Sequence, residues 1–351
     1  MPRRAREEET FESDRAAGQP HPRETLALTG QDEALGRAAR AIRSGRPPQG
    51  LLLAGPPGIG KATLAYRIAR YLLSFGANER GPADLGVAAN DPAATLVKAG
   101  AHPGLLALKR GPHPDTGKPM TILGVDEIRK LAGFFGMTSG AGGWRVAIID
   151  TADEMNDAAA NALLKMLEEP PSRAMLILVA HAPSKLMPTI RSRCQLLRLR
   201  PLGDETLGAE LTGRLPDITS EDRARLVALS GGSLGAALWL AGDDGLKLAA
   251  DAERLIDRAG APDFAATLSL AERIARLDRG METFGGYLTQ ILAARILRRA
   301  RGNEPGLERW VELRNRVGAS FNRAVALHLE PRQTILSTAR AMELATRRGA
   351  L

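Results

Sequence analysis

The sequence predicts an α/β domain built on a parallel sheet, followed by regions that are entirely helical. Three observations support this prediction. Short apolar runs alternate with helical stretches in the N-terminal part of the chain, a glycine-rich loop follows the first run, and strand-like runs stop at Pro201. Strands that alternate with helices form parallel sheets whose two faces are covered by helices.

The composition narrows the class of protein. The chain has 351 residues, enough for two or three domains, and its 44% apolar and 25% charged residues are typical of water-soluble globular proteins. No apolar run is long enough to cross a membrane, and the first residues lack the apolar core of a signal peptide, so we expect a cytoplasmic protein. The single cysteine, Cys194, excludes an internal disulfide, and the scattered histidines predict no metal site.

Four apolar runs predict the buried strands of the sheet. They are Leu51–Ala54, Leu105–Leu108, Arg145–Ile149 and Ala174–Ala180. Apolar residues at helical spacing predict helices in the same part of the chain, over Gln31–Ser44, Thr63–Phe75, Val125–Phe135 and Asn156–Glu168. The segment 77–104 is rich in Gly, Ala, Pro and Asp and is interpreted as an insert or a loop.

The remainder of the chain is predicted to be helical. Three short helices are expected over 204–215, 220–229 and 234–240, and everything from Gly245 onward has helical periodicity. The organisation expected is therefore a disordered polar tail (1–24), an α/β domain (25–202), a small helical domain (203–244) and a helical C-terminal domain (245–351).

Positive charge is concentrated near the C-terminus. The net charge of the chain is +8, and the segment from Ile291 to Leu351 has 12 arginines and 5 acidic residues, a net +7. A basic surface that faces nucleic acid and a set of solvated helix faces both explain this pattern, and the sequence leaves the two open.

The strongest local motif is Gly55-Pro56-Pro57-Gly58-Ile59-Gly60-Lys61, which follows a predicted strand and precedes a predicted helix. In such a phosphate-binding loop, Gly55, Gly58 and Gly60 let backbone N–H groups turn toward phosphates, and Lys61 reaches their oxygens. The motif departs from the hydrolytic pattern at the next position. Ala62 replaces the Ser or Thr that binds Mg²⁺, and the following Thr63 is turned by about 100° from the metal.

A second nucleotide-site motif ends the strand Arg145–Ile149. Asp150 follows this strand and would help to bind Mg²⁺, but Thr151 occupies the place of the glutamate that activates water. Reading Asp153-Glu154 as the acidic pair would bury Asp150 within an extended strand, so we reject that register. Hydrolysis by this chain itself is predicted to be impaired, and the sequence leaves open whether ATP occupies a vestigial site.

Two further motifs make the resemblance specific. Asn161-Ala162-Leu163-Leu164-Lys165-Met166-Leu167-Glu168-Glu169-Pro170-Pro171 and, about 20 residues later, Ser192-Arg193-Cys194 resemble signatures of clamp-loader AAA+ proteins. Together with the loop spacing, they resemble the δ′ family within the bacterial DNA polymerase III holoenzyme, over roughly 25–240. The resemblance implies an AAA+ (RecA-like) P-loop domain, a helical lid and a helical C-terminal collar for oligomerisation.

The resemblance also implies a role. In this family Arg193 would act as an arginine finger in trans on the ATP of a neighbouring subunit, with Ser192 and Cys194 at the interface. Implied partners are the γ/τ motor subunits, δ, the sliding clamp and, through the complex, primed DNA. The chain would then contribute to clamp loading in DNA replication without a polymerase site or efficient ATPase activity of its own.

Several positions depart from the motor pattern. The γ-phosphate sensor falls at Ala180 or His181, and Gly235 in Gly232-Ser233-Leu234-Gly235 replaces the lid arginine. Cys194 is interpreted as a small packed residue and not a redox thiol. The segment 77–101 lacks the four cysteines that bind a structural zinc in many family members, so zinc is not expected.

Two other functions stay open at this point. The chain could be a hydrolysing AAA+ motor of the γ/τ type in which Lys61 and Asp150 suffice. It could also be a DNA-binding module whose functional part is the basic C-terminus.

Overall fold

The computed structural model describes residues 20–78, 80–111, 120, 122–136, 143–242, 245–277, 280–327 and 329–347. Most of the predicted tail (1–24) lies outside these residues; at its end, His21 is buried and packs edge-on against Tyr66. The chain forms two compact units. The first comprises the described residues up to Pro216 with Gly232–Trp239, and the second comprises 217–231 and the described residues from Leu240 onward.

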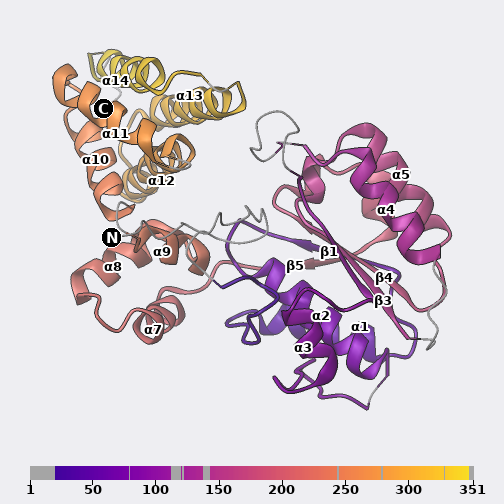
Figure 1. Cartoon of the computed structure of the whole chain (residues 1–351). Helices are drawn as coiled ribbons and strands as arrows, with labels where there is room; N and C mark the ends of the chain where they lie inside the picture. The colour runs from indigo at the N-terminus through magenta and orange to yellow at the C-terminus, as the bar shows by residue number, and fades with distance from the viewer. Residues whose placement is uncertain are drawn as a thin grey trace, which may run out of the picture. The chain divides into compact units, whose positions relative to one another are not determined.

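The first unit contains a five-stranded parallel sheet with the order β2-β3-β4-β1-β5 (Figure 1). The strands are β1 (Gly50–Ala54), β2 (Leu105–Leu108), β3 (Arg145–Ile149), β4 (Ala174–Ala180) and β5 (Gln195–Arg198). The predicted α/β fold is confirmed, as are the four predicted strands. The prediction missed β5, since this four-residue edge strand ends in an exposed arginine and lacks a continuous apolar run.

Helices cover both faces of the sheet (Figure 1). On one face, α1 (Asp32–Arg43) and α2 (Lys61–Phe75) pack on alternate strand residues such as Leu51 and Leu53. On the other face, α4 (Val125–Gly136) and α5 (Asp157–Glu168) pack on the intervening ones, including Leu52. Side chains that alternate along a strand reach opposite faces, and the near-continuous apolar strands are apolar because both faces are buried.

The segment 77–104, which its composition indicates to be an insert or a loop, contains a helix. Helix α3 (Pro92–Lys98) begins after Asp91, whose carboxylate accepts hydrogen bonds from the backbone N–H groups of Ala93 and Ala94. Asp at the N-cap and Pro at the first helical position are a strong helix start. The prediction was wrong here because only seven residues follow the cap, too few for a periodic pattern.

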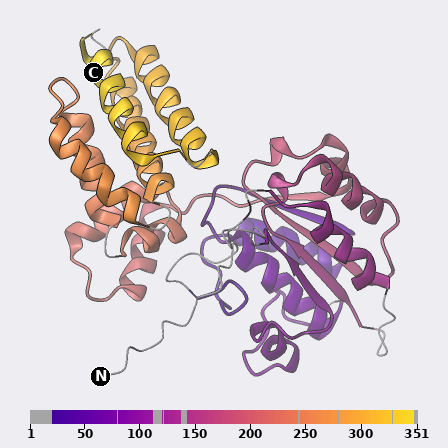
Figure 2. The same ribbon diagram turned by 45° about the horizontal axis from the view of Figure 1, so that its top comes forward.

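The helices beyond Pro201 agree with the prediction. They are α7 (Asp204–Arg214), α8 (Ser220–Ser230), α9 (Leu234–Leu240), α10 (Gly245–Asp257), α11 (Phe264–Arg276), α12 (Gly280–Arg301), α13 (Leu307–Ala326) and α14 (Pro331–Arg347). In the second unit α12 packs against α13, and α11 packs against α14 (Figure 2). The predicted apolar faces that contain Phe284 and Met342 are buried. None of the described helices combines the length and the hydropathy that a membrane crossing requires.

The three-part division after residue 24 stays a prediction. Compactness alone groups α7 and most of α9 with the sheet, and α8 with the C-terminal helices.

Candidate functional site

The glycine-rich loop lies where the sequence predicted it, between strand β1 and helix α2. Strand β1 runs between β4 and β5, so the loop leaves the carboxyl edge of the sheet beside its centre. Gly58 and Gly60 have φ values of 73° and 100°, the left-handed region that favours glycine. The strand, loop and helix therefore have the arrangement of a phosphate-binding loop.

Lys61 is held by its own loop. Its side chain is buried, and Nζ donates hydrogen bonds to the carbonyl oxygens of Gly55 (2.7 Å) and Pro56 (2.6 Å). Burial lowers the pKa of the Lys61 ammonium from 10.5 to about 8, although the negative charges of Asp150 and Asp153 oppose this shift. The ammonium thus lies inside the loop beside two carboxylates.

Asp150 lies one residue beyond β3 and is buried, as expected for the end of that strand. Thr151 follows with a left-handed backbone (φ 48°) and starts a short 3₁₀ turn, η1 (Ala152–Glu154). The acidic pair Asp153-Glu154 therefore lies beyond the strand, in agreement with the register chosen from the sequence.

Asp153 has a structural role that its place in the sequence does not predict. Its carboxylate accepts hydrogen bonds from the backbone N–H groups of His181 (3.0 Å) and Ala182 (2.7 Å), just after β4. Ala180 is the fully buried last residue of β4, and His181 comes next. Burial and the positive charge of Lys61 lower the pKa of His181 to about 4, so this imidazole is neutral near pH 7. Neither Ala180 nor His181 is the Thr or Asn that usually senses the γ-phosphate.

The N-terminal end of α9 packs directly on the phosphate loop. The backbone N–H of Gly235 donates to the Gly58 carbonyl oxygen (2.9 Å), and Ser233 Oγ donates to the Pro57 carbonyl oxygen (3.0 Å). A Cβ atom on Gly235 would lie 2.9 Å from Gly58 Cα. This position therefore accepts only glycine without a backbone shift, which explains physically why it carries no arginine.

Gln31 forms a second bridge to the loop, which no local sequence pattern predicts. Its buried side-chain amide donates to the carbonyl oxygens of Ile59 (3.3 Å) and Arg200 (2.7 Å), and its oxygen accepts from the Arg200 N–H (3.1 Å). The loop is thereby connected to the segment that follows β5. Periodicity had placed Gln31 at the start of a helix, and nothing local indicated this long-range role.

Arg193 ends helix α6 (Pro188–Arg193) and lies far from the loop of its own chain. A Cβ atom on Gly50, the first residue of β1, would be 3.5 Å from the Arg193 carbonyl oxygen. At the other end of β1, a Cβ atom on Gly55 would be 2.7 Å from the Leu199 carbonyl oxygen. Arg193 and the loop are therefore at opposite edges of the sheet, about 16 Å apart along the five residue steps from Gly50 to Gly55.

The Arg193 guanidinium is paired within the chain. Nη2 donates to Glu168 Oε1 (2.8 Å) and Nη1 donates to the Thr189 carbonyl oxygen (3.1 Å); the Arg193 side chain is 37% exposed and that of Glu168 is 51% exposed. Such an exposed ion pair contributes about 0–1 kcal/mol. The pair is therefore weak enough to exchange for a stronger anionic partner.

The two neighbours of Arg193 differ. Ser192 is exposed, and its Oγ donates to the Thr189 carbonyl oxygen (3.0 Å). Cys194 is buried in the core of the sheet, and burial raises the pKa of its thiol to about 12. The structure agrees with a packed, unreactive Cys194, whereas it does not present this thiol at a surface where a partner subunit could contact it.

The described residues contain no group of three or more His, Cys, Asp or Glu side chains that could bind a metal ion. Within 77–104, apolar packing provides the core: Leu85 and Val97 are fully buried beside α2. Tyr71 on α2 also donates a hydrogen bond to the Asn78 carbonyl oxygen (2.8 Å).

Comparisons with known proteins agree with the signature motifs. Residues 30–203 match the protein family described as "DNA polymerase III, delta subunit". The chain is 42% identical to the DNA polymerase III subunit delta' of Pseudomonas aeruginosa over 183 residues, which is 52% of each protein. It is 36% identical to the same subunit of Escherichia coli K12 over 202 residues, 57% of this chain and 56% of that one.

Similarity to the gamma/tau subunit is lower. The identity to the DNA polymerase III subunit gamma/tau of Mycobacterium tuberculosis is 30% over 195 residues, 54% of this chain and 31% of that one. A solved DNA polymerase III gamma subunit-related protein of Thermotoga maritima aligns with 90% of this chain and 99% of its own at 18% identity, with a TM-score of 0.46. The chain spans about half the length of the curated delta' relatives it matches.

Proposed function

We propose that the protein is the δ′ subunit of a bacterial clamp loader, because its residues 30–203 match the family described as "DNA polymerase III, delta subunit" and the chain is similar to delta' subunits. Its role is to help load the sliding clamp onto primed DNA during replication. Its partners in this role are γ/τ motor subunits, δ and the clamp, in the cytoplasm. It gives Arg193 to the ATP site of a neighbouring motor subunit.

The observation that carries this proposal is the position of Arg193. It is at the amino edge of the sheet, whereas the phosphate loop is at the carboxyl edge, so Arg193 cannot reach a nucleotide bound in its own chain. A guanidinium at an exposed rim can instead stabilise charge on the transferring phosphoryl group of an adjacent subunit. Release from Glu168 costs little, because that pair is exposed to solvent.

The structure of the phosphate loop supports the proposal that this chain hydrolyses ATP slowly or not at all in its own site. Lys61 donates to two loop carbonyl oxygens, and α9 contacts the loop through Ser233 and Gly235. Ala62 offers no hydroxyl for Mg²⁺, and Thr151 offers no carboxylate to activate water. If ATP enters this loop, Lys61 and the loop amides are the groups available to its phosphates, and hydrolysis there is slow.

The described C-terminal arginines support a structural role more than a DNA-binding one. Many of them are engaged within the second unit: Arg295 with Asp257, Arg332 with Glu272, Arg340 and Arg347 with Glu343, and Arg299 with Glu304 and the ring of Trp310. Ion pairs of this kind explain a large part of the basic composition without nucleic acid.

The test is ATP turnover by a complex reconstituted from this chain, motor subunits and δ, with clamp and primed DNA. Arg193→Ala is expected to lower turnover by at least tenfold at the dependent site, as expected for loss of an arginine finger. Arg191→Ala is the matched control, since Arg191 is exposed on the same helix, and it should leave turnover unchanged.

Lys61→Ala distinguishes the proposal from a hydrolysing motor. It should change turnover little in the same complex. The proposal is wrong if Lys61→Ala abolishes turnover while Arg193→Ala has no effect, because the chain would then hydrolyse ATP in its own loop.

A further inference from the structure

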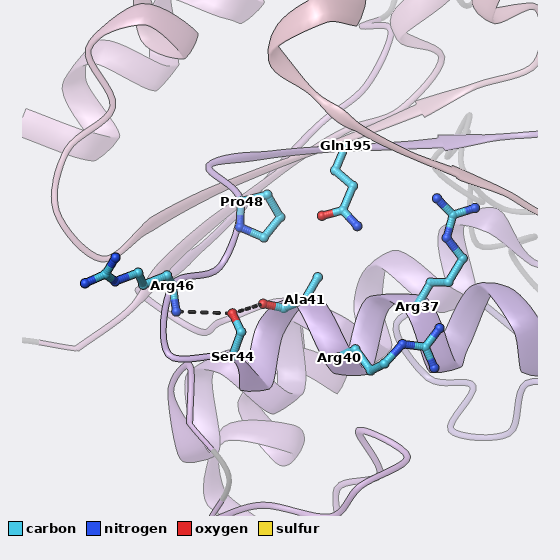
Figure 3. A pocket seen from close by; sticks show the side chains of 7 residues that line it. All are labelled: Arg37, Arg40, Ala41, Ser44, Arg46, Pro48 and Gln195. Carbon is cyan, nitrogen blue, oxygen red and sulfur yellow. Dashed lines mark hydrogen bonds between the residues drawn. The ribbon is translucent and has the colours of Figure 1, made fainter.

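A basic depression lies on the first unit, away from the phosphate loop. It has a volume of about 500 Å³ and is formed by α1, by the turn that follows α1, and by the first residue of the edge strand β5 (Figure 3). Its polar lining consists of Arg37, Arg40, Ser44, Arg46 and Gln195. In Figure 3, Gln195 extends from β5 toward α1, while Arg37 and Arg40 extend from successive turns of the helix.

The charge of this depression is uncompensated. Arg37, Arg40 and Arg46 are all exposed, and among the described residues no carboxylate lies within ion-pair distance of them. Arg200 differs from these three arginines, because it forms an ion pair with Glu33 of α1. In Figure 3 the guanidinium group of Arg46 extends away from those of Arg37 and Arg40, so the three groups offer separate contacts to anionic groups along this surface.

Helix-dipole compensation accounts for only part of this pattern. Basic residues are common in the last turn of a helix, where they offset the partial negative charge of its carbonyl end. Arg40 lies in the last turn of α1, but Arg37 precedes that turn and Arg46 lies beyond the helix. Two of the three arginines thus need another explanation.

Hydrogen bonds give the depression a defined floor. Ser44 Oγ donates to the Ala41 carbonyl oxygen (2.8 Å) and accepts from the Arg46 backbone N–H (3.2 Å), which fixes the turn after α1 (Figure 3). Arg37 Nη2 donates to the carbonyl oxygen of Leu196 on β5 (3.3 Å). The arginines are therefore presented from ordered backbone.

The lining chemistry selects a phosphate group. Guanidinium forks and a side-chain amide match phosphate oxygens. No aromatic residue lines the depression, so it has no platform on which a base could stack. Arg37 donates a hydrogen bond to the Leu196 carbonyl oxygen, which faces outward from the edge strand β5. This hydrogen bond disfavours pairing of an acidic peptide with β5 as an added strand.

We propose that the depression between α1 and the start of β5 binds the phosphodiester backbone of duplex DNA, independently of base sequence. Contacts to phosphates position a protein on DNA and carry no sequence information, in keeping with a lining of charged and amide groups alone. The proposal goes beyond the action of Arg193 and does not depend on it, because its test measures DNA binding by this chain alone; Gln195 nevertheless lies only two residues from Arg193.

The test is a salt titration of binding between the full-length chain and a fluorescently labelled duplex of about 20 base pairs. Each neutralised phosphate contributes about 0.9 to the slope of log affinity against log salt. The triple variant Arg37→Gln, Arg40→Gln, Arg46→Gln should therefore lose about 2 to 3 from this slope. The titration covers about 50 to 200 mM salt. At about 50 mM, the triple variant should bind the duplex at least tenfold more weakly than wild type does.

A matched variant controls for net charge. Arg258, Arg276 and Arg316 are exposed in the second unit, and changing all three to Gln removes the same charge. The proposal predicts that this variant keeps the wild-type slope to within about 1. Equal losses in the two triple variants would overturn it, as would the absence of measurable binding by wild type.

Competition separates DNA from small phosphates. If the backbone is the ligand, inorganic pyrophosphate at matched ionic strength should not displace the duplex. Displacement by pyrophosphate at that ionic strength would instead make the depression a site for small phosphates and refute the backbone assignment. Both triple Arg→Gln variants should keep the wild-type circular dichroism spectrum. A triple Arg→Lys variant at positions 37, 40 and 46 keeps the positive charge, so it should bind the duplex more tightly than the triple Gln variant at the same positions.

Discussion

Gly235 offers a direct test of the contact between α9 and the phosphate loop. The Cβ atom introduced by Gly235→Ala would lie 2.9 Å from Gly58 Cα and 3.0 Å from the Gly58 carbonyl oxygen, both backbone atoms. It would push α9 from the loop and weaken the 2.9 Å hydrogen bond from the Gly235 N–H to the same oxygen. Overpacking of this kind costs about 1 to 3 kcal/mol.

Gly208→Ala in α7 is the matched control. Gly208 belongs to the same unit and is also helical, but a Cβ atom there would meet nothing within 4 Å. Replacing a helical glycine with alanine in open space should stabilise the unit by about 0.5 to 1 kcal/mol. The two variants therefore make the same chemical change with opposite expected signs.

Thermal and urea unfolding followed by circular dichroism measure the difference. In a unit of this size, 1 kcal/mol shifts the midpoint by about 2 to 4 °C, so Gly235→Ala should unfold at least about 3 °C below Gly208→Ala. Equal midpoints would refute the close packing of α9 on the loop, and with it the physical reason why this position carries no arginine.

Three further predictions concern Lys61, Cys194 and Asn156. Because burial lowers the pKa of Lys61 from 10.5 to about 8, the folded state carries a penalty below pH 8 that disappears as the pH rises toward 10.5. Wild type should gain about 2 kcal/mol of unfolding free energy over Lys61→Met between about pH 7.5 and 9.5 in urea titrations, and a constant difference would contradict the burial of this ammonium. Cys194, whose pKa is about 12, should resist iodoacetamide at about pH 8 until urea unfolds the chain; labelling of the native protein at the rate of a free thiol would show that it is not buried. Asn156 Oδ1 accepts from the Ala159 N–H (2.8 Å) at the start of α5, so Asn156→Ala should cost about 1 kcal/mol in urea unfolding, and an unchanged midpoint would mean that this cap is not formed.

Local patterns predicted much of the fold because the sheet is buried on both faces. Strand β4 is apolar at all seven positions and fully buried, so its sequence alone marks it. Strand β5 lies at the edge of the sheet, where exposed side chains such as Arg198 interrupt the apolar pattern. Helix α3 was missed for a different reason, since a seven-residue helix shows its cap but not its period.

The candidate site was predictable where motifs are contiguous and not where they combine distant segments. Gly55 to Lys61 and Asp150 were found from their place after predicted strands. The contact of Ser233 with Pro57 joins residues 176 positions apart, and no local pattern encodes such a pair. The same holds for Gln31 and Arg200. The pairing of Arg193 with Glu168 also depended on how α5 and α6 pack, which periodicity does not describe.

The parallel sheet gives this protein a direction. All five strands run the same way, so the phosphate loop is at one end of β1 and Arg193 lies near the other. In the proposed clamp loader, a subunit with unlike ends would join its neighbours head to tail, as in heterologous interfaces. Each end would then contact a different neighbour, and substitutions at the two ends are far enough apart to have additive effects on stability. The proposed action of Arg193 as an arginine finger therefore does not require an active nucleotide site in the same chain.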